Sequence, residues 1–124
     1  MEDTIYSADI LVVGGGVSGI AAAVEAADTG LNVVLIEKEP FLGGMAIRMN
    51  RYFPKLCPPT CGLELNFRRI GNNPRIRVFT LAVIESISGI EGSFKASVRL
   101  SPRKVNDRCT ACGECVHVCP VKRP

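Results

Sequence analysis

Four cysteines near the end of the chain have the spacing of an iron–sulfur ligand set. They are Cys109, Cys112, Cys115 and Cys119. The pattern C-x2-C-x2-C-x3-C-P is the bacterial ferredoxin run, in which three thiolates on a short loop bind one [4Fe-4S] cluster and the fourth reaches another. Structural zinc sites usually pair two separated C-x2-C units or add two histidines, and this sequence has neither. The run therefore predicts a cluster, and we expect His117, between two valines, to be a loop side chain.

The partner of the fourth thiol is open, because the sequence contains no second ferredoxin run. Cys119 could join cysteines from later in a longer chain, join Cys57 and Cys61, or close the first cluster itself. The sequence does not choose among these three arrangements.

Cys57 and Cys61 form a second, less common pair. Pro58 and Pro59 stand between them and prevent both thiols from lying on one regular helical turn, so a shaped loop must hold them. Basic residues precede the pair and a helix should begin at Thr60, which together favour thiolates. Three interpretations remain: ligands of a further cluster, a redox dithiol, or buried structural cysteines.

A glycine-rich turn near the start of the chain predicts a phosphate-binding loop. The apolar run at residues 10–13 is typical of a buried parallel strand, and Gly14-x-Gly16-x-x-Gly19 follows it. Gly14 permits the tight turn, Gly16 lets a pyrophosphate approach the backbone, and Gly19 lets the next helix pack closely on the strand. The N-terminus of that helix then presents free N–H groups to a phosphate.

The residues after this turn complete a βαβ unit. An alanine-rich helix is predicted over residues 17–29 with Gly30 as its stop, and residues 33–36 form a second apolar strand. Glu37 ends that strand 18 residues after Gly19, where a ribose-binding acid belongs. The order of these parts predicts dinucleotide binding. An acid at this position also favours a free 2′-hydroxyl and disfavours NADP.

The rest of the chain predicts further elements of an α/β domain. Gly43 and Gly44 let the backbone turn close to a ligand. A helix is expected over residues 60–70, with Thr60 as N-cap and Gly71 as stop. Residues 75–88 should form two short strands, residues 89–92 a turn and residues 94–100 a half-buried strand. We therefore expect residues 82–100 to make a hairpin or meander over the sheet.

Composition narrows the function classes. Residues 1–47 carry seven acids and one base, a net −6, whereas residues 48–124 carry 14 bases and five acids, a net +9. The bases are dispersed, so a solvated face is expected and nucleic-acid binding is not. The longest uncharged run, residues 10–24, is too short and glycine-rich to span a bilayer. Cysteines in a ligand spacing indicate a reducing compartment, and we expect a cytoplasmic chain without direct membrane insertion.

The motifs together resemble a known family. The segments 13–19, 36–40 with 43–44, 52–64 and 109–124 are similar to the N-terminal part of the A subunit of the quinone-interacting membrane-bound oxidoreductase complex, and more broadly to the A subunit of heterodisulfide reductase. The first two segments occur in many flavoproteins. The stretch Pro-Lys-Leu-Cys-Pro-Pro-Thr-Cys is narrower and favours the quinone-interacting complex. Because family members are several times longer, we expect the chain to be a fragment.

The resemblance implies FAD, at least one [4Fe-4S] cluster, and electron transfer within a multi-subunit cytoplasmic assembly linked to anaerobic sulfur and energy metabolism and docked to a quinone-reactive membrane partner. Residues 1–101 would be a partial FAD-binding Rossmann-like domain, and residues 102–124 the start of a ferredoxin-type segment. No residue is assigned a catalytic role. The residues assigned to the cofactor are Gly14, Gly16, Gly19, Glu37, Lys38, Gly43 and Gly44.

Two other function classes remain. A pyridine-nucleotide-dependent disulfide reductase would use Cys57 and Cys61 as its dithiol, although such enzymes have a C-x4-C pair and the spacing here is C-x3-C. A cofactor-free interaction module is the alternative without enzymatic activity. It is disfavoured because every glycine and cysteine position that the cofactors need is filled.

Overall fold

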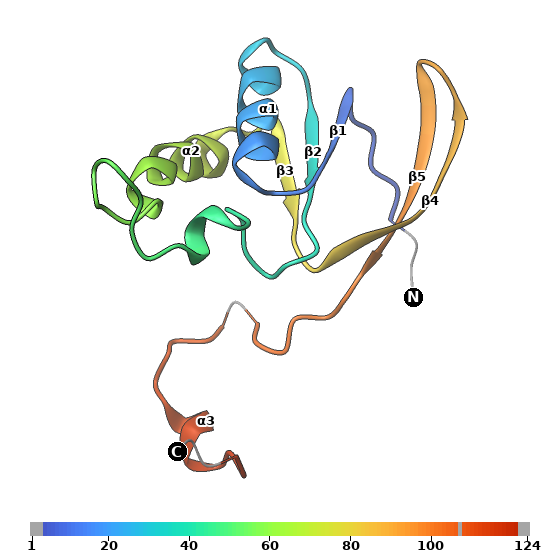
Figure 1. The fold of residues 1–124 in the computed structure, drawn as a ribbon. Coiled ribbons are helices and arrows are strands. Elements are labelled where there is room, and N and C mark those ends of the chain that lie inside the picture. The colour runs from blue at the N-terminus through green and yellow to red at the C-terminus, as the bar shows by residue number, and fades with distance from the viewer. Residues whose placement is uncertain (1–3, 107, 122–124) are drawn as a thin grey trace.

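A three-stranded parallel sheet with two helices on one face forms the centre of the fold (Figure 1). The computed structural model describes residues 4–106 and 108–121. The sheet has the order β1 (Ile10–Val13), β2 (Val33–Ile36), β3 (Ile76–Phe79), and the helices are α1 (Val17–Asp28) and α2 (Thr60–Asn72). The predicted α/β class and the βαβ unit are confirmed.

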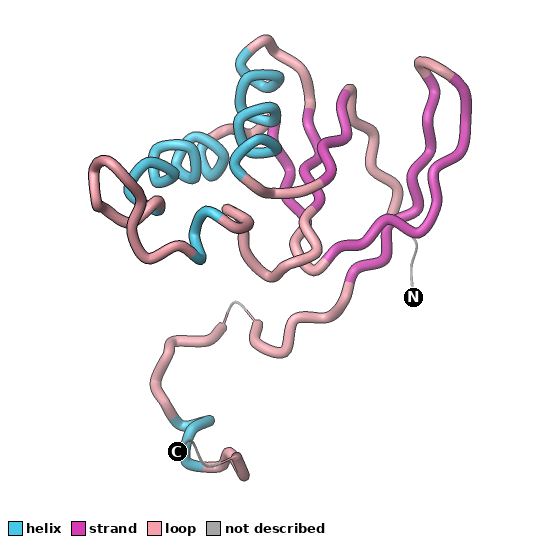
Figure 2. The backbone as a smooth tube through the Cα atoms, in the orientation of Figure 1, coloured by secondary structure: helices cyan, strands magenta, loops and turns pink. Residues whose placement is uncertain are grey.

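The register of the strands aligns their carboxyl ends at one edge of the sheet. Val13 pairs with Ile36, and Ile36 pairs with Phe79, so the loops that follow all three strands leave from the same side. In open α/β sheets this is the edge at which ligands bind. Figure 2 shows the loops at this edge in relation to the strands.

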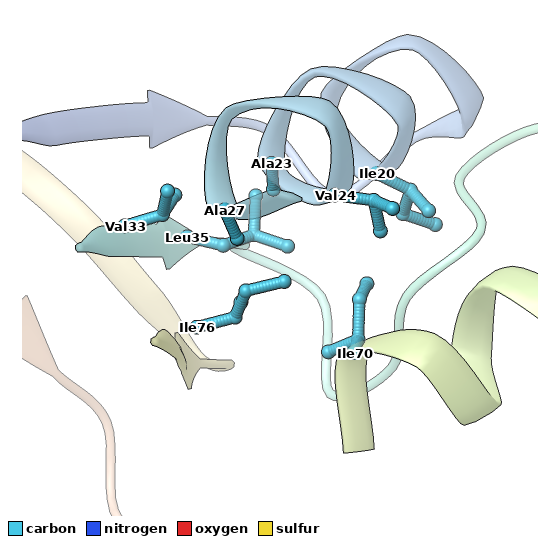
Figure 3. Close-up of a cluster of buried hydrophobic side chains, with 8 residues drawn as sticks. All are labelled: Ile20, Ala23, Val24, Ala27, Val33, Leu35, Ile70 and Ile76. Atoms are coloured by element: carbon cyan, nitrogen blue, oxygen red, sulfur yellow. The ribbon is translucent and has the colours of Figure 1, made fainter. Parts of the chain in front are cut away.

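The core lies between the sheet and the helices. Alanines on α1 let the helix approach the sheet, and the branched side chains of β2 and β3 fill the space beneath it (Figure 3). The buried cluster consists of Ile20, Ala23, Val24, Ala27, Val33, Leu35, Ile70 and Ile76. Successive strand residues point to opposite faces, so Leu11 and Val13 of β1 face away from the helices and are exposed. Ile10 and Val12 are only half-buried, so the expectation that the first strand is buried is wrong.

Helix α2 differs from its prediction at both ends. Its N-cap is Pro59 rather than Thr60, and no side chain caps it; the φ of proline already suits a helix start. Gly71 lies inside the helix, which continues to Asn72. One face of the helix is apolar: Leu63 and Ile70 are buried and Phe67 packs against the core.

The next two strands form a hairpin of their own. β4 (Ala82–Ile90) pairs antiparallel with β5 (Ser93–Leu100), and a bulge interrupts the register between Ile84 and Ser86. In Figure 1 the hairpin stands on the side of the sheet away from the helices, and most of its residues are exposed. Gly89 is paired with Phe94, so the turn is shorter than expected. In β5 only Val98 is half-buried, which contradicts the expected half-buried strand.

Two short helices complete the elements. η1 (Ala46–Arg48) follows the Gly43–Gly44 turn, and α3 (Glu114–His117) lies within the cysteine run. The segment that carries α3 extends away from the sheet and helices (Figure 1). In the described ranges, no helix is long and apolar enough to cross a membrane.

Candidate functional site

The glycine-rich turn after β1 has the geometry that a phosphate loop needs. Gly14 has φ +101°, and its N–H donates to the Ile36 carbonyl at 2.7 Å. A Cβ on Gly19 would stand 1.8 Å from the Gly14 carbonyl oxygen, so only glycine lets α1 pack this closely on the turn. A Cβ on Gly16 would meet nothing within 4 Å. The space in front of Gly16 is therefore open to a ligand.

The N-terminus of α1 is prepared for an anion. Gly16 is its N-cap, with an extended backbone and no side chain to satisfy the first amides, and no acidic residue lies in the first turn. Uncapped N–H groups and the helix dipole together favour a phosphate at this position.

Glu37 is the only polar residue among the buried ones that the structure describes, with 6% of its surface exposed. Its Oε2 accepts a hydrogen bond from the Gly15 N–H at 2.6 Å, and its Oε1 accepts one from the Glu39 N–H at 2.8 Å. Each carboxylate oxygen has a second lone pair, which a ribose hydroxyl could use. Glu37 therefore joins the phosphate loop to the loop after β2.

Gly15 is a residue that the motif did not single out. A Cβ there would stand 2.4 Å from Leu42 Cδ2 and 3.1 Å from Glu37 Oε2. The motif leaves this position free, and only the packing of the neighbouring loop shows that a side chain would collide with it.

The Gly43–Gly44 turn closes against the same loop. The Gly43 N–H donates to the Gly15 carbonyl at 2.7 Å, and both glycines have positive φ, +110° and +57°. A Cβ on Gly44 would lie 3.1 Å from Gly16 Cα. The structure thus brings together the predicted glycines and Glu37 at the carboxyl edge of the sheet.

A cavity of about 280 Å³ lies beside this edge, between the strand ends and the base of the hairpin. Lys38 is exposed and lines it, next to Glu37. The lining residues are Val13, Gly14, Ile36, Glu37, Lys38, Ala82, Val83 and Ile84. An apolar cavity beside a buried carboxylate and an uncapped helix fits the adenosine portion of a dinucleotide.

The cysteine run is exposed. All four of its thiols are free, and within the described ranges no three metal-ligating side chains gather into a site. The loop nevertheless favours a thiolate at Cys112, whose pKa is lowered, first by a hydrogen bond from the Glu114 backbone N–H and then by the Thr110 side chain. Ala111 and Gly113, on either side of Cys112, have positive φ and bend the backbone there. Because metal loops commonly take their final geometry from the metal, the donor set fits a cluster.

Cys57 and Cys61 lie where the long connection after β2 meets the start of α2. Cys57 is half-buried, whereas Cys61 is exposed in the first turn of α2. An exposed cavity of about 400 Å³ is lined by Pro58, Thr60, Cys61, Glu64 and Phe67.

Tyr52 is a neighbour of this pair that sequence reasoning missed. Its backbone forms an isolated bridge with Cys57, with Tyr52 N–H donating to the Cys57 carbonyl at 3.3 Å. The pKa of the Tyr52 hydroxyl is raised, chiefly by its hydrogen bond with the Cys57 side chain and then by the negative charge of that thiolate. No periodicity in the sequence announces a pairing of this kind.

Family comparison identifies both parts of the chain. A model of FAD dependent oxidoreductases matches residues 9–101. The chain belongs to this family. A 4Fe-4S binding domain model matches residues 102–122, so the chain combines an FAD-binding domain with a [4Fe-4S]-binding one.

The similar curated proteins belong to heterodisulfide reductases. The second A-type iron-sulfur subunit of CoB–CoM heterodisulfide reductase in Methanopyrus kandleri is 40% identical over 115 residues, which are 92% of this chain and 18% of that protein. An Archaeoglobus profundus protein that is named for its likeness to the A subunit of heterodisulfide reductase is 38% identical over 91% of the chain and 16% of its own length. The chain thus resembles the N-terminal part of these A-type flavoproteins and spans less than one fifth of their length.

Solved structures share the fold. L-proline dehydrogenase from P. horikoshii aligns with a TM-score of 0.61 at 22% identity, covering 75% of this chain and 19% of that one. Thioredoxin reductase from T. acidophilum aligns with a TM-score of 0.59 at 24% identity, covering 73% and 30%.

Two glycine variants separate packing from ligand approach. Gly16→Ala adds a methyl group into open space, so we expect unchanged thermal stability but at least tenfold weaker FAD binding, because the methyl group occupies the path of the pyrophosphate. Gly19→Ala should lower stability as well, since the methyl group collides with the Gly14 backbone. Flavin titration and thermal melting of both proteins check this. Equal FAD affinity in Gly16→Ala and the wild type would contradict the phosphate-loop assignment.

Proposed function

We propose that this chain is the flavin- and cluster-bearing segment of an electron-transfer subunit in a multi-subunit oxidoreductase. The observation that carries the proposal is that a preformed dinucleotide cradle and a four-cysteine ligand run occur in one chain of 124 residues. A bound flavin exchanges electrons in pairs or singly and a cluster only singly, so the two together convert between a two-electron donor and a one-electron path.

In this proposal the chain's own residues bind the two cofactors and orient them. Gly14, Gly16 and Gly19 admit the pyrophosphate to the N-terminus of α1, and Glu37 accepts hydrogen bonds from the ribose while it holds the two loops in register. Lys38 lies at the rim and offsets phosphate charge, and the Gly43–Gly44 turn supports the loop from the other side. The residues that bind the cluster are Cys109, Cys112, Cys115 and Cys119.

We further propose a quinone-interacting complex as the assembly. The narrow segment around Cys57-Pro-Pro-Thr-Cys61 supports this assignment over the methanogen enzymes. The relatives' names describe them as subunits, which supports partner subunits here too. The assembly would be cytoplasmic, contribute to sulfate reduction, and contact the inner face of the membrane through a quinone-reactive partner.

The proposed function is tested first by the cluster. Cys112→Ser should remove about four iron and four sulfide per protein from the loop, because a three-cysteine wrap that loses its middle ligand cannot complete the cluster. His117→Ala is the matched control: His117 ends the short helix α3 instead of lying in a loop as expected, its helix is exposed, and its loss should leave iron unchanged. Anaerobic iron and sulfide analysis decides between them, and zinc without acid-labile sulfide would falsify the cluster assignment.

Electron exchange between the two cofactors tests the function itself. When the flavin of the intact, anaerobically purified protein is photoreduced with EDTA as the sacrificial electron donor, electrons should pass from the flavin to the cluster, and the visible absorbance of the cluster should bleach in the wild type. In Cys112→Ser the flavin should still be reduced while this bleaching is lost. A wild-type cluster that stays oxidised beside a reduced flavin would contradict an electron-transfer role.

We also propose that Cys57 and Cys61 serve a cofactor, as ligands of a further cluster or as a redox dithiol. Two prolines stiffen the loop before anything binds, which lowers the cost of ordering a ligand loop but adds little to a core. The exposure of Cys61 in the first turn of α2, where the helix dipole favours a thiolate, also supports the proposal.

Replacing both cysteines by serine should therefore change iron content or the rate of flavin reduction while the protein stays soluble. Both quantities are measured on one preparation, and Thr60→Ser, between the prolines and Cys61, is the control. If iron and rate match the wild type and only thermal stability falls, the two residues are structural.

A further inference from the structure

The segment that leads from the hairpin to the cysteine run is hydrogen-bonded to loops at the carboxyl edge of the sheet, which we call the nucleotide edge after the proposed cofactor site there. The Ser101 N–H donates to the Leu81 carbonyl at 2.8 Å. Two residues later the Arg103 guanidinium donates to the Thr80 hydroxyl and to the Pro40 carbonyl, the latter at 3.5 Å. Thr80 follows β3 and Pro40 belongs to the loop after β2. Arg103 thus connects the linker to two loops at the carboxyl edge of the sheet.

These loops lead directly to the proposed ribose carboxylate. The Leu81 N–H donates to the Glu39 carbonyl at 3.1 Å, and the Ala82 N–H donates to the Glu37 carbonyl at 3.0 Å. The Glu39 N–H in turn donates to the Glu37 side chain. Arg103 is therefore connected to Glu37 and Gly15 by hydrogen bonds between neighbouring residues of these loops.

We propose that Arg103 is a positioning residue that docks the linker of the cluster segment onto the nucleotide edge and so keeps the cluster close to the flavin. The inference rests on the proposed electron transfer between the two cofactors. Arg103 then limits the separation of flavin and cluster, a role that neither the family match nor the cysteine spacing assigns.

The number of residues between the anchor and Cys109 limits how far the cluster can move from the nucleotide edge. Cys109 lies six positions after Arg103, so the first cluster ligand lies within about 21 Å of the anchor along an extended chain. A turn in which the Cys109 N–H donates to the Asn106 carbonyl at 3.2 Å shortens this span further. Without Arg103 the last anchor is Ser101, and the reach grows to about 28 Å. The volume within reach grows as the cube of this distance, so the effective concentration of the cluster at the flavin should fall by a factor of about 2.4.

The contacts are exposed, so they should matter for position more than for stability. Hydrogen bonds of exposed side chains contribute little to the free energy of unfolding. We therefore expect variants at Arg103 and Thr80 to fold and to retain their cofactors, which makes the rate of electron exchange interpretable.

The test uses the intact protein with its flavin and clusters. Arg103→Ala and Thr80→Val should each lower the rate of flavin-to-cluster electron exchange by at least twofold, with unchanged flavin, iron and melting temperature. Thr80→Ser keeps the hydroxyl and should retain the wild-type rate. Lys104→Ala removes the adjacent exposed positive charge and is the matched control. The double variant Arg103→Ala with Thr80→Val should be no slower than Arg103→Ala alone, because Arg103→Ala already removes the contact with Thr80.

A second readout separates this inference from the proposed function. Hydrogen exchange of the amides in residues 101–106 should be faster in Arg103→Ala and Thr80→Val but not in Lys104→Ala. Wild-type rates of both electron exchange and hydrogen exchange in Arg103→Ala would overturn the docking role, as would an equal slowing of electron transfer in Lys104→Ala. If the wild type shows no flavin-to-cluster transfer, the proposed function fails, and hydrogen exchange alone then decides whether Arg103 docks the linker.

Discussion

The nucleotide edge depends on one buried carboxylate. Burying a charge costs free energy unless it is hydrogen-bonded, and Glu37 satisfies this by accepting one backbone N–H on each oxygen, at 2.6 Å and 2.8 Å. These bonds fix the phosphate loop relative to the loop after β2. Other segments are hydrogen-bonded to these two loops. The Gly43–Gly44 turn bonds to Gly15, the start of β4 bonds to the Glu37 backbone, and the linker to the cysteine run is connected through Leu81 to Glu39.

Close packing around that carboxylate explains the glycine content better than the motif alone. Gly19 is required because the Gly14 backbone occupies the space of a Cβ, and Gly15 is closely surrounded by the Leu42 and Glu37 side chains, whereas Gly16 is bordered by open space that a ligand can use. The same motif therefore contains glycines of two kinds. Gly19 has no room for a side chain and Gly14 has a positive φ, so both serve the fold, whereas Gly16 has room and an ordinary φ and serves the approach of the cofactor.

The sequence predicted the elements whose signals are local and missed the features that depend on distant contacts. The strands β1 and β2 match their predictions because short β-branched runs are bounded by glycine or charged residues. The end of α2 was misplaced because Gly71 does not take the positive φ of a glycine stop, and its weak helix propensity alone does not end the helix. The partners of Arg103 and Tyr52 could not be foreseen, since they come from loops that only the folded chain brings together. The cysteine spacing specifies donors, but their final arrangement forms with the metal.

The most direct measurement is the FAD affinity of Glu37→Ala beside Glu39→Ala. Glu39 contributes its backbone N–H to the network while its side chain pairs with Arg48 at 3.3 Å, so its truncation leaves the Glu37 carboxylate and both of its donors in place. If Glu37 holds the loops and the ribose, Glu37→Ala should weaken FAD binding by about 1.5–3 kcal/mol, ten- to a hundredfold or slightly more, and Glu39→Ala should leave it near wild type. Equal FAD retention in Glu37→Ala and the wild type would contradict the account.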